Sequence, residues 1–487
     1  MSQLPAILDS ANAMPGTVIG YVSVRSQGGT SFLDADDVSE AEAFYGSDSD
    51  HREATQAVTS AGLEVLAESR LGKAVAGPPE AFAELTGGEL VARERLMHTR
   101  TGRVEYVTHL DVVGGGQPDA LGVAVPRSEA SGIEGVVLER PRAPMALFPA
   151  PVPPSITRFH IRVPDDVGTI LGAAEAHRRG HVGDGVVVAM VDSGHYRHPF
   201  FVAHRYRIQP PVAMVPGTSP AIDPHGHGTG ESANVFAVAP GAVLRPYRAS
   251  DSAGRLVAAL AGFVRAKGDQ PDVITNSWGG DDPYPPQGPP DAADRPLVLE
   301  VRDAIAKGIV VIFSAGNGQF SVEPQVPGVI AAGGVYASTG LDLQASNYAS
   351  GYQSPWFGGV QVPLVSGLVG MLPRASYIML PIPSGCPIDT ERATAAGDPA
   401  DGTAPNDGWA LFSGTSAAAP QIAGAAALLR GVKAGATPAQ VTAALSSTAI
   451  DVRTGSCNPR FNNPATAGRD LATGFGLVNA SAAAAAI

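Results

Sequence analysis

Five short apolar segments, separated by segments with helical periodicity, constrain the fold of this chain more than any other feature. The apolar segments lie at residues 186–191, 243–247, 273–277, 309–314 and 329–332, and the two clearest helical segments lie at about 256–267 and 297–307. Continuous apolar segments of this length are typical of strands that are buried on both faces. Because buried strands that alternate with helices form parallel sheets covered on both sides, the sequence predicts an α/β fold in three layers.

The chain before this region has a different pattern. Residues 17–24 alternate like a strand, 50–61 form a helix with one apolar face, 63–67 and 73–77 suit a hairpin, and a helix at 79–85 and a strand near 90–93 follow. This order is that of a split βαβ, or ferredoxin-like, sandwich. A chain of 487 residues is also long enough for two domains. We therefore expect residues 1–135 to form a small α+β domain.

A bridge rich in proline lies between the two patterns. Residues 140–154 contain Pro141, Pro144, Pro149, Pro151, Pro153 and Pro154. Proline has no backbone N–H and a fixed φ, so we expect no regular secondary structure in the bridge. The predicted organisation is therefore a small domain over residues 1–135, a linker over 136–165 and the α/β domain over 166–487.

Charge and composition exclude several classes of partner. The formal net charge is −13, whereas nucleic-acid binding depends on clustered Lys and Arg. No apolar run reaches the length of a membrane span, so we expect neither nucleic acid nor membrane as a partner.

The first residues lack the features of a secretory signal, which predicts a cytoplasmic protein and leaves secretion by a non-standard route open. Cys386 and Cys457 cannot form a disulfide framework; two free thiols are expected, with mutual pairing as the alternative.

A serine at the start of an alanine-rich helix is the strongest candidate for a reactive group. Ser416 follows the small-residue turn at residues 414–415, and the helix continues through residues 420–429. The first N–H groups of a helix have no intrahelical partner and lie at the positive end of its dipole. That environment favours a nucleophile whose attack creates an oxyanion, so Ser416 is predicted to take part in acyl transfer.

Three further polar residues follow predicted strands or lie in glycine-rich turns. Asp192 ends the strand at 186–191, and the carboxyl ends of parallel strands hold the catalytic groups of α/β enzymes. His227 lies between two glycines that leave its imidazole unobstructed. The amide of Asn317, after the strand at 309–314, is able to donate to a developing oxyanion. Each of these residues, taken alone, is more often found in a structural turn than in a catalytic site. The His225–His227 spacing lacks the further ligands of a metal site, and no metal site is predicted.

The segments that carry these residues resemble the motifs of the subtilisin-like serine proteases, the subtilases. The matching segments are Val191-Asp192-Ser193-Gly194, Gly226-His227-Gly228-Thr229, Ala315-Gly316-Asn317-Gly318 and Gly414-Thr415-Ser416-Ala417-Ala418-Ala419-Pro420. They occur in the order Asp, His, Ser that distinguishes this family from other triad proteases. The resemblance extends from about residue 166 to the end of the chain, where residues 474–479 are similar to the closing motif of the family.

The resemblance implies a subtilisin-like domain and a serine endopeptidase that hydrolyses peptides or proteins without a cofactor. By analogy, Ser416 attacks the scissile carbonyl, His227 transfers the proton and Asp192 orients His227. Asn317 completes the oxyanion hole. Substrate pairs as an added strand along residues 277–280. The implied substrate-binding residues are Ser277, Trp278, Gly279, Gly280, Ala315 and Gly316.

Three features depart from the family pattern. Gly230 stands where relatives have a second histidine, and we expect only an effect on local packing. Residues 231–238 form a shorter connection than is usual. Trp278 replaces a small aliphatic residue and enlarges one pocket wall. A separate hypothesis places Glu323 near the floor of the first specificity pocket, where it would favour Arg or Lys at the cleavage position; the alternative is a surface glutamate.

The resemblance also gives the first domain a role. Subtilases are commonly preceded by a small pro-domain that assists folding and blocks the active site, so residues 1–135 are expected to be the intramolecular inhibitor of a zymogen. A permanent accessory domain is the alternative.

Two alternatives to the endopeptidase activity stay open. One is a transpeptidase or peptide cyclase, and the other is a catalytically dead binding protein. Calcium is often bound in the family; Asp281-Asp282 and residues 398–401 offer acidic ligands without a diagnostic spacing.

Overall fold

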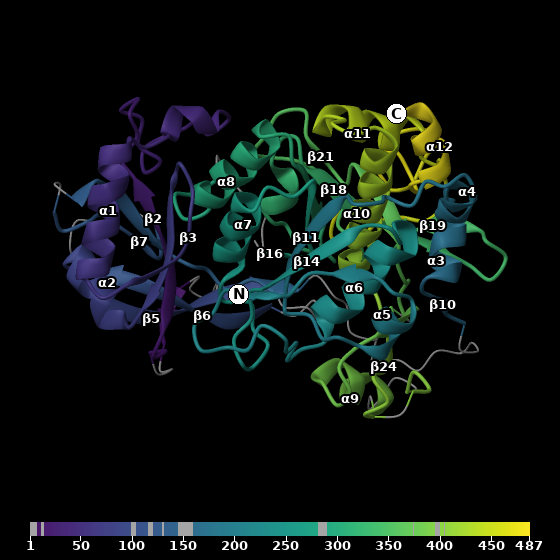
Figure 1. Ribbon diagram of the computed structural model, residues 1–487, viewed down its shortest axis with the longest axis horizontal. Coiled ribbons are helices and arrows are strands. Elements are labelled where there is room, and N and C mark those ends of the chain that lie inside the picture. Colours follow the sequence, from purple (N-terminus) through teal and green to yellow (C-terminus); the bar gives the residue numbers. More distant parts are fainter. Residues whose placement is uncertain are drawn as a thin grey trace, which may run out of the picture.

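The computed structural model describes residues 7–10, 14–98, 104–114, 120–128, 131–144, 159–280, 290–373, 375–394, 400–403 and 405–487. A smaller α+β unit from the beginning of the chain lies beside a larger α/β unit (Figure 1). The helices α7 (Ala259–Gly268) and α8 (Arg295–Ala306) belong to the larger unit and lie on the side that faces the smaller one.

The larger unit is built on a mostly parallel sheet. Its strands lie in the order β12-β14-β11-β15-β17-β18-β19, with β13 beside β14 and β22 beside β18. The neighbouring strands are parallel, apart from the antiparallel pair β18–β19. The strands are β11 (Val187–Asp192), β12 (Arg207–Ile208), β13 (Val212–Ala213), β14 (Val243–Arg248), β15 (Val273–Asn276), β17 (Val310–Ser314), β18 (Ile330–Ala337), β19 (Leu343–Ala345) and β22 (Val365–Leu368). The predicted parallel sheet is confirmed.

Helices cover both faces of this sheet, because its strands are apolar on both. Val188 and Met190 of β11 pack into the core shared with α6 and α10, whereas Ala189 and Val191 pack into the core shared with α7 and α8. The first face carries α3 (Asp165–Ile170), α4 (Ala173–Arg178), α6 (His227–Val238), α10 (Thr415–Val432), α11 (Pro438–Ser447) and α12 (Ala480–Ala486). The three-layer architecture is therefore as predicted, and α7 and α8 are the two predicted helices.

The smaller unit is an open sandwich with strand order β3-β4-β2-β8-β7. Its elements are β2 (Val18–Val24), α1 (Asp48–Ser60), β3 (Glu64–Glu68), β4 (Gly72–Gly77), α2 (Pro79–Thr86), β7 (Val123–Ala124) and β8 (Ile133–Leu138). One prediction needs correction here. The strand near residue 90 does not complete the sandwich: as β5 (Glu89–His98) it pairs with β1 (Ile7–Asp9) and β6 (Val104–Val113) in a separate sheet. The nearly continuous apolar strand β8 takes the edge of β2 instead.

The two units meet across a charged and well-packed interface. Lys267 of α7 forms buried ion pairs with Glu300 and Asp303 of α8. From the smaller unit, the Tyr21 hydroxyl donates to Glu300 at 2.5 Å and the Tyr45 hydroxyl donates to Asp303. A buried charge is tolerated when it is paired and its remaining hydrogen-bonding capacity is satisfied. The smaller unit thus supplies two of the hydrogen bonds that stabilise this buried ion cluster.

The bridge between the units contains a short strand, contrary to prediction. Ala143–Pro144 form β9, which pairs antiparallel with β16 (Trp278–Gly279). Proline is compatible with a short strand at positions where no N–H is needed for the ladder. β8 runs past the predicted boundary at residue 135, β10 (Ile161–Arg162) pairs with β23 (Ile378–Pro381), and residues 145–158 of the predicted linker lie outside the described residues.

The remaining described elements are α5 (Pro199–Ala203), α9 (Pro387–Thr394), β20 (Tyr352–Gln353), β21 (Gln361–Val362), β24 (Trp409–Phe412) and the short 3-10 helices η1 (Ala41–Phe44) and η3 (Glu323–Gln325). Cys386 and Cys457 are buried free thiols. Across the described ranges, no helix combines the length and apolar character that a membrane crossing requires.

Candidate active site

Ser416 lies in the first turn of α10, directly after the turn that connects this helix to β24. Its side chain is fully buried. The hydroxyl donates to the backbone carbonyl of Ser277 at 3.2 Å, and the Ser277 hydroxyl donates to the carbonyl of Ser416 at 2.8 Å. This reciprocal pair fixes the predicted nucleophile against the end of β15, where the predicted substrate-binding segment begins.

His227 and Asp192 are directly hydrogen-bonded. The two elements β11 and α6 place them together, since Asp192 is the last residue of β11 and His227 the first of α6. His227 Nδ1 lies 2.7 Å from Asp192 Oδ1, which also accepts from the Ser193 N–H at 2.7 Å. A Cβ on Gly228 would lie 2.3 Å from the Gly194 carbonyl oxygen, so a glycine is needed for this close approach.

The carboxylates around His227 favour its charged form. Burial lowers the pKa of His227, but Asp192, through its charge and its hydrogen bond, with Glu231 and Asp223 contributing less, outweighs burial and raises the pKa above its ordinary value. His227 Nε2 is buried without a hydrogen-bond partner among the described residues, and the Ser416 hydroxyl donates to Ser277 instead. His227 and Ser416 are therefore not hydrogen-bonded to each other here.

Glu231 is a site residue that the sequence analysis missed. It lies one turn after His227 on α6, it is fully buried, and its Oε1 is 3.9 Å from His227 Nε2. Asn234 Nδ2 donates to its other oxygen at 2.9 Å. Burial, reinforced by Asp192 and opposed by His227, raises the pKa of Glu231 to about 8. The i,i+4 spacing of the two titratable residues on this helix was the signal that could have found it.

Asn317 is tied to the residue that precedes Ser416. Its Oδ1 accepts from the Thr415 N–H at 2.9 Å and from the Thr415 hydroxyl at 3.1 Å. The Gly316 N–H donates to the same hydroxyl at 3.1 Å. Ala315 continues β17 by donating its N–H to Ala332 at 2.9 Å. The turn at residues 315–317 is thus held against the start of α10 by hydrogen bonds, and the Asn317 side-chain oxygen accepts two of them.

The segment from Ser277 to Gly280 is paired with another part of the same chain. Pro144 lies opposite Trp278 and Ala143 opposite Gly279, and Arg142 forms a bridge with Leu256 on the other side. The bridge segment therefore lies between β16 and the loop at Leu256 of the larger unit as an added strand.

Trp278 is more deeply placed than a simple pocket wall. Its side chain is fully buried, its Nε1 donates to the Val191 carbonyl at 2.8 Å, and its ring packs edge-on against Phe313. A second departure noted in the sequence, Gly230, has a packing cause: a Cβ at this position would lie 2.1 Å from Phe412 Cζ, so no histidine fits there.

No metal centre is apparent in the part of the chain that the structure describes, where no group of three or more His, Cys, Asp or Glu side chains could hold an ion. Asp281-Asp282 and residues 398–399 lie outside the described residues. Asp401 accepts hydrogen bonds from Thr403 and from the Leu411 N–H. A calcium site therefore stays a prediction.

Comparisons with known proteins agree on one family. The sequence model of the Subtilase family matches residues 183–476. Subtilisin from Bacillus pumilus is 29% identical over 325 residues, which cover 64% of this chain and 95% of that protein. Subtilisin E from Bacillus subtilis (strain 168) is likewise 29% identical over 325 residues, covering 64% and 69%. Fervidolysin from Fervidobacterium pennivorans, a keratinolytic enzyme related to subtilisin, aligns with a TM-score of 0.53 at 18% identity; the alignment covers 96% of this chain and 61% of that one, and it supports the fold alone.

Proposed function

This chain belongs to the subtilase family and is a serine-type endopeptidase; from that premise we propose that Ser416, His227 and Asp192 are its catalytic triad and that its own N-terminal region holds the active site closed. The observation that carries the proposal is the path of β9, which pairs with Trp278–Gly279 as a bound peptide would. Ser277, which precedes this segment, is the hydrogen-bond partner of Ser416.

The proposed chemistry gives each of the three side chains one role. Ser416 Oγ attacks the scissile carbonyl while His227 Nε2 accepts the hydroxyl proton. Asp192, bonded to Nδ1, holds the imidazole in the tautomer that leaves Nε2 able to accept, and it stabilises the imidazolium. The proton then passes to the leaving amine, and water hydrolyses the acyl-enzyme with His227 again as the base. The Ser416 N–H and the Asn317 amide are the proposed donors to the oxyanion.

The contacts of the N-terminal region support inhibition. Glu139 accepts the Leu260 N–H at 2.6 Å near the start of α7, where the helix dipole favours a carboxylate. Three residues on, Arg142 is buried against the protease unit. The Tyr21 and Tyr45 contacts with Glu300 and Asp303 attach the rest of the region to α8. Protein or peptide substrates are then expected to compete for a segment that β9 already occupies.

Self-processing tests this function. Purified wild-type protein is expected to separate into two chains, with a new N-terminus shortly after Pro144, and peptide hydrolysis is expected to rise as the N-terminal chain is lost. Intact mass spectrometry followed over time, with activity measured on the same samples, gives both quantities. An intact chain with full and constant activity would contradict the inhibitory role, and the Ser416→Ala chain is the control that should stay intact.

Glu231→Gln is expected to leave the acidic limb of the kcat/KM profile in place below about pH 8. A general base must be neutral, so activity appears as pH rises through its pKa. Because the pKa of Glu231 is raised to about 8, its side chain is mostly neutral at lower pH, and Asp192 and Asp223, which also face His227, remain in the variant. The neutral amide therefore reproduces the uncharged state that Glu231 has on this limb. Asp192→Asn, which removes a carboxylate charge beside His227, is the contrasting variant and should move the limb to lower pH. A limb that moves to lower pH by about one unit in Glu231→Gln requires a charged Glu231 and contradicts this expectation.

A further inference from the structure

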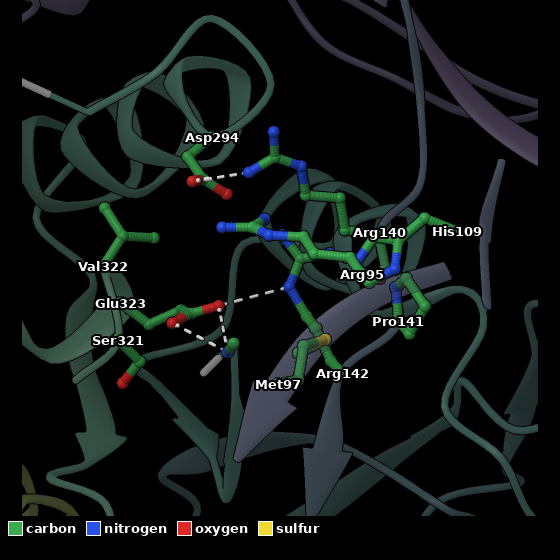
Figure 2. A pocket seen from close by; sticks show the side chains of 11 residues that line it. Arg95, Met97, His109, Arg140, Pro141, Arg142, Asp294, Ser321, Val322 and Glu323 are labelled. Carbon is green, nitrogen blue, oxygen red and sulfur yellow. Dashed lines mark hydrogen bonds and ion pairs between the residues drawn. The ribbon is translucent and has the colours of Figure 1, made fainter. Parts of the chain in front are cut away.

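Arg142 is one of the residues that line a pocket beside the peptide-binding segment (Figure 2). Its side chain is only 4% exposed. Nε lies 3.2 Å from Glu323 Oε1, Nη1 lies 3.6 Å from Glu139 Oε1, and the guanidinium carbon is 5.7 Å from the centre of the Trp278 ring. A guanidinium that is both paired with carboxylates and close to an aromatic ring is a specific recognition arrangement rather than a solvated surface charge.

The acidic groups of this pocket come largely from the protease unit. Glu323 begins η3, is 1% exposed, and accepts from the Gly280 N–H with both oxygens at 3.2 Å. Asp294 lies across the same pocket and forms an ion pair with Arg140 at 3.0 Å (Figure 2). Burial raises the pKa of Glu323 and the charge of Arg142 opposes that rise. When the N-terminal region leaves, Arg140, Arg142 and Glu139 leave with it, and the two carboxylates lose these partners.

The strand register assigns the pocket to one position of a substrate. Trp278 faces Pro144 and Gly279 faces Ala143, so a peptide bound in this register places its next residue opposite Ser277, beside Ser416. If that residue is counted as the first before the cleaved bond, the Pro144 position is the second, the Ala143 position the third and the Arg142 position the fourth. The Glu323 pocket therefore receives the fourth residue rather than the first, which differs from the hypothesis based on sequence.

We propose that Glu323 is a specificity-determining residue that selects substrates with arginine as the fourth residue before the scissile bond. The inference rests on the proposed function, in which substrate replaces β9 on the Trp278–Gly279 segment. A buried carboxylate costs free energy unless a cation pairs with it, so a neutral residue at this position leaves Glu323 without compensation. Arginine is favoured over lysine because its planar fork is able to contact Glu323 and lie near Trp278 together.

The test uses processed enzyme and a set of fluorogenic peptides that differ only at the fourth residue: Arg, Lys, Gln or Leu. Wild type is expected to cleave the Arg peptide with kcat/KM at least about tenfold above the Gln peptide, with Lys between them. In Glu323→Gln the Arg to Gln ratio is expected to fall to within about threefold, since the neutral amide neither attracts the cation nor suffers from its loss. The ratio within one preparation is the readout, so it does not depend on the active fraction.

Glu323→Gln alone leaves Arg142 facing a neutral group in the unprocessed chain and could impair folding. The double variant Arg142→Gln with Glu323→Gln removes both charges and serves as the second arm, with the same expected loss of preference. Equal cleavage of all four peptides by wild type, or a retained Arg preference in either variant, overturns the inference alone. Cleavage of none of them by processed wild type contradicts the proposed function, and this inference with it.

Discussion

Replacing Ser416 by alanine is expected to reduce peptide hydrolysis by at least about 10⁴-fold, the scale established for loss of a triad serine in a subtilisin and other triad proteases. The variant loses the atom that bonds to the substrate carbonyl, whereas peptide binding along Trp278–Gly279 and the oxyanion donors remain. The fold should persist, because α10 is a buried helix rich in alanine and the lost hydroxyl makes a single hydrogen bond to Ser277.

Steady-state hydrolysis of a fluorogenic peptide measures this loss, with circular dichroism melting to verify the fold. Ser447→Ala, near the end of α11, is the matched control and should retain activity within about twofold, since surface substitutions rarely have large effects. Folded Ser416→Ala protein with activity within tenfold of wild type is incompatible with Ser416 as the nucleophile.

Asp192→Asn should also reduce kcat/KM by about 10⁴-fold, a magnitude carried over from the equivalent change in another triad protease. Asp192 Oδ1 accepts from both His227 Nδ1 and the Ser193 N–H. An amide has one accepting oxygen and a donating NH₂ group, so it can hold the imidazole in the wrong tautomer. It also lacks the charge that raises the pKa of His227, and the residual activity should therefore extend to lower pH than in wild type.

The pH profile of kcat/KM in wild type and variant measures both effects. Asp184→Asn is a suitable control, because Asp184 lies just before β11 and its side chain is 80% exposed; its activity should match wild type. Full activity in folded Asp192→Asn protein, with an unmoved acidic limb, would show that Asp192 has no part in catalysis.

Five strands of the large sheet, β11, β14, β15, β17 and β18, could be predicted because they are largely apolar segments buried in the sheet, as β11 and β17 illustrate. The short strands β12, β13, β19 and β22 were not predicted. The pairing of Asp192, which ends β11, with His227, which begins α6, was expected from the resemblance of both segments to subtilase motifs. These features follow from the order of apolar and polar residues within short segments of the chain. The same holds for α7, α8 and the first elements of the small sandwich, whose boundaries differ little from prediction.

Other features depend on contacts between distant parts of the chain. β9 has only two residues, one of them proline, and forms only because Trp278–Gly279 offers a partner edge. β8 pairs with β2 and so occupies the place in the sandwich that was predicted for the strand near residue 90. Glu323 was noticed, but the register that assigns it to the fourth substrate position comes from the pairing of β9. These pairings join segments that are far apart in the sequence, so the residues of one segment alone do not predict them.

The central claim is that Ser416 is a protease nucleophile that the N-terminal region keeps covered. Labelling with a fluorophosphonate probe, with the adduct mapped by peptide mass spectrometry before and after processing, tests it most directly. The account predicts one adduct, on Ser416, forming slowly on the intact chain and rapidly once the N-terminal region has been lost. An adduct on another serine, or equally rapid labelling of Ser416 in the intact chain, would contradict it.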